Sequence, residues 1–236
     1  MNGTALIVGA GTGLGAALAR RFARAGMKVA VARRSSDQLA PLVDELGGSA
    51  RAYACDATDE SAVQGLFAAV ASDLGRPALV VFNAGAFVRR SVVDTSREDF
   101  ERCWRVACLG GFLVGREAAR AMLAHDAAHK GTILFTGATA SLRGGAQFHN
   151  LAVGKFGLRA LAQSMARELQ PQGIHVAHVV IDGQIESERP GHSAAERGSD
   201  AVIDPAAIAE TYYQLHVQPR SAWTLELDLR PYVEKF

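Results

Sequence analysis

The chain has 236 residues, of which 49 % are hydrophobic and 21 % charged, and its formal net charge at pH 7 is +1. This composition suits a globular domain with a sizeable core, and the near-zero charge argues against nucleic acid as a partner. No apolar run reaches the roughly 18 residues of a membrane span, and the N-terminus lacks the features of a signal peptide, so we expect no membrane association and a cytoplasmic location.

Short runs rich in Val, Ile and Leu alternate with helix-length segments along the chain. Strands are predicted at 5–8, 28–32, 50–54, 78–82, 131–135 and 174–181, and helices at 14–25, 37–46, 60–74, 97–124 and 151–170. This alternation predicts an α/β fold, with a single doubly wound, Rossmann-type parallel sheet and helices on both faces. The alternating pattern of 221–228 suggests an additional edge strand.

The most informative stretch is residues 5–15, Ala-Leu-Ile-Val-Gly-Ala-Gly-Thr-Gly-Leu-Gly, an apolar strand followed by a glycine cluster and a helix. Glycines let the backbone approach a pyrophosphate, and the N–H groups at the start of the helix favour its charge. We expect cofactor contacts from Gly9, Gly11, Thr12, Gly13, Leu14 and Gly15. No linker or repeat divides the chain, so we expect residues 1–236 to form one dinucleotide-binding domain.

The end of the second predicted strand indicates which dinucleotide binds. NAD-binding folds usually place an acidic residue there to hold the ribose hydroxyls, whereas this strand ends in Arg33 and Arg34. A guanidinium group matches a 2′-phosphate in charge and in bidentate geometry. The predicted cofactor is therefore NADP, with NAD as the less favoured choice.

The chain resembles the short-chain dehydrogenase/reductase family from residue 5 to about residue 185. The glycine motif of that family aligns with Val8 to Gly15, its Asn-Asn-Ala-Gly stretch is similar to 82–85, and its adenine-contacting acid matches Asp56. The resemblance implies that Asn83 and Gly85 also line the cofactor site. It further implies a small-molecule substrate and a homodimer or homotetramer formed through the helices at 97–124 and 151–170.

The resemblance also implies four catalytic positions, and the sequence departs from three of them. Lys155 matches the family lysine, which binds the nicotinamide ribose, but Leu151 stands where the family has its tyrosine acid. Ala138 stands at the serine position and Ala107 at the asparagine position. The family's Pro-Gly after the sixth strand becomes Asp182-Gly183, and Ser187 is the hydroxyl expected to meet the nicotinamide amide.

Other side chains could replace the missing acid. His149, just before the predicted last helix, titrates near neutral pH, and Thr139 could supply a hydroxyl after a one-residue shift of its loop. Residues 183–204, rich in Gly, Ser and charge, leave the carboxyl end of a strand and are a candidate substrate lid. We expect no metal: His125 and His129 have suitable spacing but no acidic third ligand.

Three functions remain open at this point. The first is an NADP-dependent oxidoreductase that transfers a hydride to a small carbonyl or imine-type substrate without a tyrosine acid. The second is a catalytically silent protein that senses NADP. The third is a non-redox enzyme that uses the same pocket around His149 and Asp182.

Overall fold

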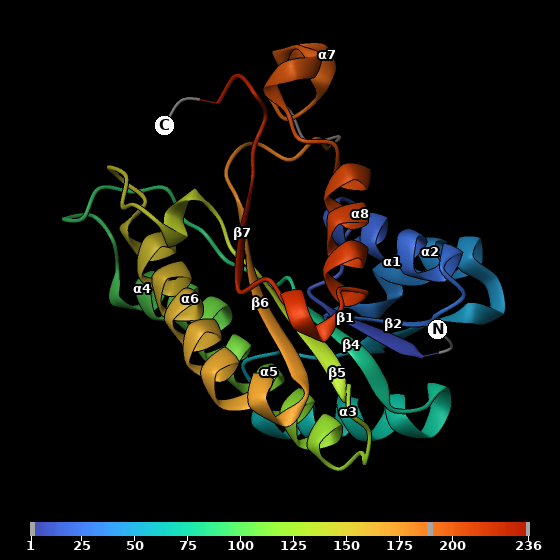
Figure 1. The fold of residues 1–236 in the computed structure, drawn as a ribbon. Coiled ribbons are helices and arrows are strands. Elements are labelled where there is room, and N and C mark those ends of the chain that lie inside the picture. Colours follow the sequence, from blue (N-terminus) through green and yellow to red (C-terminus); the bar gives the residue numbers. More distant parts are fainter. Residues whose placement is uncertain (1–2, 188–190, 235–236) are drawn as a thin grey trace.

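The computed structural model describes residues 3–187 and 191–234, and the fold is a seven-stranded parallel sheet between two layers of helices (Figure 1). The strands are β1 (Thr4–Val8), β2 (Lys28–Arg33), β3 (Ala50–Ala54), β4 (Pro77–Phe82), β5 (Gly131–Thr136), β6 (Ile174–Ile181) and β7 (Glu226–Leu229). The helices are α1 (Leu14–Arg24), α2 (Ala40–Leu46), α3 (Glu60–Leu74), α4 (Arg97–Trp104), α5 (Gly110–Leu123), α6 (His149–Leu169), α7 (Ala194–Arg197) and α8 (Pro205–His216). The predicted doubly wound α/β fold is confirmed.

The strand order is β3-β2-β1-β4-β5-β6-β7, and every neighbouring pair is parallel. The chain therefore moves outward from β1 in one direction and then returns to build the other half from β4. The carboxyl ends of β1 and β4 flank this reversal, which is where α/β sheets of this type bind their ligands. The glycine-rich turn after β1 lies at this point.

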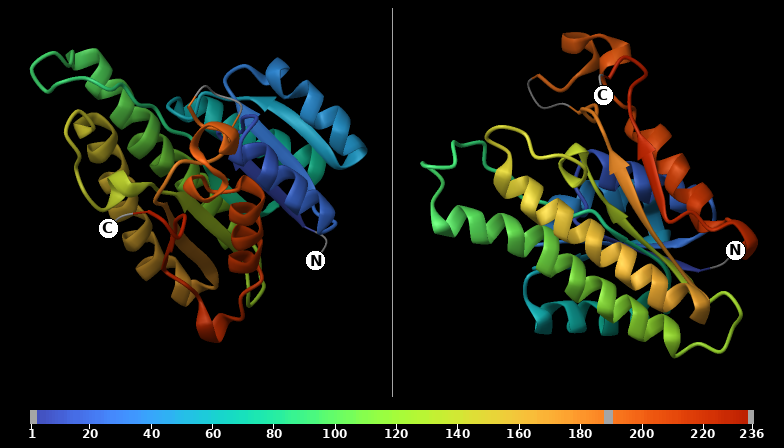
Figure 2. Two further views of the ribbon diagram at one scale, coloured as in Figure 1. Left: turned by 90° about the horizontal axis from the view of Figure 1, so that it is seen from above. Right: turned by 60° about the vertical axis from the view of Figure 1, so that its left-hand side comes forward.

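Two hydrophobic layers hold the helices against the sheet. One contains buried side chains of α1, α2 and α8, including Phe22 and Tyr212, and the other contains those of α3, α5 and α6, including Phe67 and Leu158. Figure 2 shows the helices on the two faces of the sheet in two further views. Because both faces are covered, strands such as β6 are buried along their whole length, which explains their continuous apolar character.

Four details of the sequence prediction needed correction. The helix expected at 97–124 is interrupted by a turn of π-helix at Arg105–Leu109, and His149 begins α6 rather than preceding it. The edge strand is shorter than predicted and covers Glu226–Leu229. The helix α8 was missed, although Asp204 caps its first turn and Pro205 opens it.

Candidate functional site

The glycine turn after β1 combines tight packing with open space. At Gly9, which has a φ of +90°, an added Cβ would lie 2.4 Å from the backbone nitrogen of Ala84, and at Gly15 it would lie 2.7 Å from the Cα of Ala10. At Gly11 and Gly13, by contrast, an added Cβ would meet nothing within 4 Å. Gly9 and Gly15 therefore allow close packing of the backbone, whereas Gly11 and Gly13 leave the backbone open to a ligand.

The helix behind this turn suits an anion. Helix α1 begins at Leu14, directly after Gly13 and Thr12, and its first turn carries no acidic side chain. The positive end of the helix dipole is thus not offset by a local carboxylate. The turn and the helix together fit the pyrophosphate of a dinucleotide.

The end of β4 is tied to the same turn. The backbone nitrogen of Asn83 donates to the carbonyl of Val8 at 2.8 Å, and its side-chain amide donates to the carbonyl of Gly9 at 3.0 Å. Two residues later, an added Cβ on Gly85 would lie 3.8 Å from Lys155 Nζ. These contacts connect the predicted phosphate site to the predicted catalytic lysine along one edge of the sheet.

The carboxyl ends of β2 and β3 carry the residues predicted to hold the adenosine part. Arg33 is the last residue of β2 and is partly buried, whereas Arg34 is exposed. No ion pair within 3–187 or 191–234 uses either guanidinium group. Asp56, after β3, accepts hydrogen bonds from the backbone nitrogen and the hydroxyl of Thr58, so its carboxylate is held in a local turn.

Lys155 is buried in α6, and its Nζ donates to the backbone carbonyl of Thr136 at 2.7 Å. Burial disfavours the charged ammonium and lowers the pKa of Lys155 from 10.5 to about 8. Leu151 lies one helical turn before it and is partly buried. The side chain one turn before the lysine is therefore apolar, and burial makes the charged form of the amine less favourable than it is in water.

The predicted asparagine position lies in the turn of π-helix between α4 and α5. Ala107 is buried there, and an added Cβ on Gly154 of α6 would lie 2.9 Å from the Cβ of Ala107. The two helices therefore touch at this point. Single turns of π-helix inside α-helices frequently occur at functional sites, and this one lies against α6 one residue before Lys155.

Thr139 lies in the loop after β5 and is engaged with the end of β6. Its hydroxyl donates to Asp182 Oδ1 at 2.5 Å, and Asp182 Oδ2 lies 3.3 Å from Arg230 Nη2. Sequence reasoning named Thr139 and Asp182 separately but missed Arg230, which lies 48 positions after Asp182 in the chain. Ala138, before Thr139, is extended, and its nitrogen donates to the Ser141 hydroxyl at 3.1 Å.

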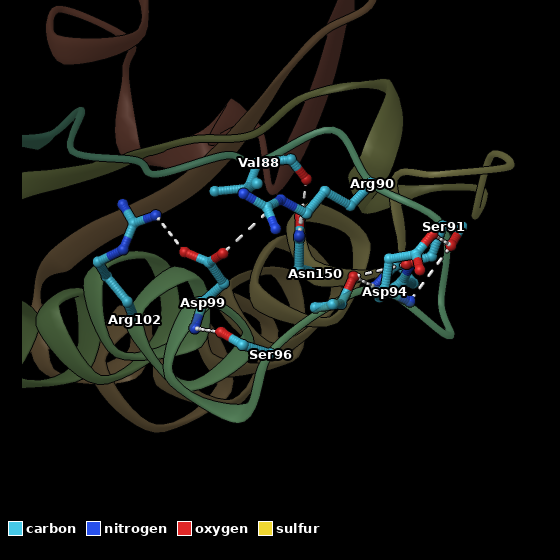
Figure 3. Close-up of polar contacts among 10 residues, drawn as sticks. Val88, Arg90, Ser91, Asp94, Ser96, Asp99, Arg102 and Asn150 are labelled. Carbon is cyan, nitrogen blue, oxygen red and sulfur yellow. Dashed lines mark hydrogen bonds and ion pairs between the residues drawn. The ribbon is translucent and has the colours of Figure 1, made fainter.

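His149 faces the segment that follows β4. Its Nε2 lies 2.9 Å from the hydroxyl of Thr95, which itself donates to the carbonyl of Ser91. The next residue, Asn150, donates from its amide to the carbonyl of Val88 at 2.7 Å (Figure 3). The start of α6 thus holds the segment after β4 through these hydrogen bonds. The acid role of His149 stays a prediction.

The segment after β6 folds back on itself. Ile185 and Ile203 form an isolated parallel bridge, and the backbone nitrogen of Ser187 donates to the carbonyl of His192 at 3.1 Å. Tyr232, near the C-terminus, donates its hydroxyl to Asp200 at 3.0 Å. The candidate lid at 183–204 therefore stands beside the C-terminal tail, as Figure 1 shows around α7, while residues 188–190 lie outside the described part.

Two predicted absences can be compared with the structure. Within the described ranges, no group of three or more His, Cys, Asp or Glu side chains is arranged to hold a metal ion. The described helices include none that is long and apolar enough to cross a bilayer. The three cysteines are free thiols; Cys55 and Cys103 are buried, and Cys108 is partly exposed.

The switch-point geometry, the open glycine turn and the buried lysine are those of a doubly wound protein of the dinucleotide-binding class. The profile of the family described as short chain dehydrogenase matches residues 3–193. The chain therefore belongs to the short-chain dehydrogenase/reductase family of NAD(P)-dependent oxidoreductases.

Individual relatives agree with this assignment. The solved structure of a short-chain dehydrogenase from Rhodopseudomonas palustris is 44 % identical, with a TM-score of 0.81, and the match covers 97 % of this chain and 98 % of that one. The (21S)-21-acetoxyl-apo-melianone synthase of Melia azedarach is 32 % identical over 89 % of this chain and 74 % of that protein. Sorbitol-6-phosphate 2-dehydrogenase of Escherichia coli (strain K12) is 32 % identical over 90 % of this chain and 83 % of that protein.

Proposed function

We propose that the protein is an NADP-dependent oxidoreductase that transfers a hydride to a small carbonyl or imine-type substrate without a tyrosine acid. The observation that carries this proposal is the position of Lys155. The lysine lies at the same sheet edge as the open glycine turn, and its Nζ is near Gly85 and bonded to the Thr136 carbonyl. A cofactor whose pyrophosphate lies on α1 would extend toward this amine.

The preference for NADP rests on the end of β2. Neither Arg33 nor Arg34 is used in an ion pair within the described ranges, so both guanidinium groups can meet a 2′-phosphate. The strand places no carboxylate there to bind the two ribose hydroxyls of NAD. When bound, the reduced nicotinamide supplies the hydride.

Each of the chain's own residues then has a limited task. Lys155 binds the ribose hydroxyls and keeps an ionisable amine buried one helical turn after Leu151. Thr139 presents a hydroxyl at the end of β5, and Ser187 lies in the segment that would cover the nicotinamide. His149 positions the segment after β4 through Thr95.

A second function is favoured by a specific observation. Leu151, Ala138 and Ala107 carry no side-chain proton donor, and general acid catalysis is typically worth about 10²- to 10⁴-fold in rate. A protein that senses NADP without turning it over would need the dinucleotide site but not these groups.

One experiment separates the two. NADPH binding is first followed by fluorescence, and absorbance at 340 nm then reports oxidation with ketones, aldehydes and cyclic imines in a stopped-flow instrument. Binding with oxidation supports the oxidoreductase, whereas tight binding with no oxidation across the panel supports the sensor. Absence of NADPH binding would contradict both.

We also propose that copies of the chain associate through the exposed faces of α4, α5 and α6. Apolar side chains stand exposed on α4, α5 and α6, namely Phe100, Trp104, Phe112, Val153 and Phe156. Burial of such a surface stabilises association by about 25 cal/mol per Å² before the entropic costs. A homodimer or homotetramer of single-domain subunits is therefore expected.

The three cysteines are free thiols, which is compatible with the proposed cytoplasmic location.

A further inference from the structure

Asp182 is a carboxylate that is only 4 % exposed at the carboxyl end of β6. Its backbone nitrogen donates to the carbonyl of Leu229 at 2.8 Å, so the end of β7 fixes its position. A buried carboxylate is unfavourable unless it is paired and hydrogen-bonded. Arg230, the residue after β7, supplies the charge partner, and Thr139 supplies the hydrogen bond.

The hydrogen bond to Asp182 fixes the direction in which the Thr139 hydroxyl donates its proton. A hydroxyl has one proton to donate, and a carboxylate only accepts. Because the proton of Thr139 is directed at Asp182 Oδ1, the hydroxyl offers only its lone pairs to a neighbouring ligand. Thr139 follows the carboxyl end of β5 and is partly exposed, so it is not sealed in the core. A ligand atom against it must therefore be a hydrogen-bond donor, which a carbonyl oxygen is not.

We propose that the Thr139–Asp182 pair selects a protonated imine nitrogen as the group beside the hydride-accepting carbon. This inference rests on the proposed oxidoreductase function and names its substrate class. The N–H of an iminium ion donates to the Thr139 oxygen, and the Asp182 carboxylate behind it favours the positive charge. Arg230 offsets part of that carboxylate charge, so the selection depends mainly on the direction of the Thr139 hydrogen bond.

The chemistry balances without an acid from the protein. With reduced nicotinamide as the hydride source, a C–H bond would form at the iminium carbon, and the electron pair of the C=N π bond would become the lone pair of the product amine. The nitrogen keeps its proton throughout, so no proton is required from the side chains at 107, 138 and 151. Reduction of a carbonyl, by contrast, leaves an alkoxide that must receive a proton.

The test compares a matched pair of substrates, 2-methyl-1-pyrroline and cyclopentanone, by NADPH oxidation at a single pH. The wild type should favour the imine. Asp182→Asn should lower kcat/KM for the imine by about 10- to 100-fold, because the asparagine amide can donate to Thr139 and turn the hydroxyl proton toward the ligand. The ketone should be unaffected or improved, and the NADPH affinity should not change.

Two further variants keep the result interpretable. Asp228→Asn is the matched control, since Asp228 also pairs with Arg230 but is exposed and makes no bond to Thr139. It should leave the ratio of imine to ketone activity unchanged. Thr139→Ser should keep the preference for the imine, and Thr139→Val should abolish that preference. Thermal unfolding is measured for every variant.

Several outcomes would overturn the proposal. Equal losses for imine and ketone in Asp182→Asn would show a merely structural role, as would the same loss in Asp228→Asn. Turnover of ketones but not imines by the wild type would refute the substrate class while leaving the oxidoreductase function in place. NADPH binding with no turnover of any substrate would refute the oxidoreductase function and this inference with it.

Discussion

Replacement of Lys155 by methionine tests the buried amine independently of any substrate. Because burial lowers the pKa of Lys155 from 10.5 to about 8, the unfolded chain binds one more proton than the folded chain between these two pH values. The free energy of unfolding then rises with pH, since its slope follows the number of protons bound by the unfolded state minus that bound by the native state.

The magnitude follows from the two pKa values. The shift corresponds to a penalty of about 3 kcal/mol for burying the charged amine, which disappears as the pH rises through both values. Between pH 8 and pH 9.5 the wild type should gain about 2 kcal/mol relative to Lys155→Met, which has nothing to titrate at this position. Other groups that titrate in this range are present in both proteins and cancel in the difference.

The assay is urea denaturation of wild type and Lys155→Met at several pH values from 7 to 10. Lys28→Met is the control, because Lys28 is exposed at the start of β2. Lys155→Met also removes the hydrogen bond from Lys155 to the Thr136 carbonyl. This loss lowers the free energy of unfolding by a constant amount and does not change its dependence on pH. If wild type and Lys155→Met follow the same pH dependence, Lys155 is not desolvated in the way the structure indicates.

Three other predictions concern the proposed cofactor, the proposed replacement of the tyrosine acid and the assembly. Replacing Arg33 and Arg34 together by alanine should weaken NADPH binding by about 10- to 100-fold, as loss of charged hydrogen bonds does, and leave NADH binding unchanged in a fluorescence titration. Leu151→Tyr with Ala138→Ser should create or raise ketone reduction at 340 nm; high native activity that falls on this change would instead make Leu151 part of a substrate pocket. Phe112→Glu should shift the species seen by light scattering toward monomer, and an unchanged mass would exclude the surface around this residue from the interface.

The strands were the most predictable part of the fold. β3, β6 and α3 have the boundaries that the sequence predicted, because buried parallel strands and long apolar helices leave continuous signals. The turn of π-helix at Arg105–Leu109 was not predicted, since it contains no Gly or Pro that would mark an interruption of the helix. Helix α8 was missed although its capping residue Asp204 and Pro205 were visible in the sequence.

The candidate site also contains residues that the sequence could predict and residues that it could not. The glycine turn and Lys155 have local signals, a motif and a fixed helical spacing, and the structure brings them to one edge of the sheet. The pair of Asp182 and Arg230 has none, because it depends on the parallel register of β6 and β7, in which Ile181 lies opposite Leu229. Hydrophobic periodicity therefore could not predict that Arg230, the residue after the short edge strand β7, would pair with Asp182.

The energetics of this pair support a functional reading over a structural one. A buried ion pair commonly contributes little net stability, because the desolvation of both charges offsets their attraction, and an apolar pair of similar volume is often equal or better. Asp182 follows the apolar run of β6, where a hydrophobic residue would continue the core at no such cost. The position is nevertheless occupied by a carboxylate that accepts a hydrogen bond from Thr139, a partly exposed residue after the carboxyl end of β5. Where a local rule of burial is broken without a gain in stability, a site is the expected reason. If that reasoning holds, replacing both partners, Asp182→Leu together with Arg230→Leu, should be tolerated in thermal unfolding while imine turnover is lost. Strong destabilisation of this double variant would instead show that the pair serves the fold.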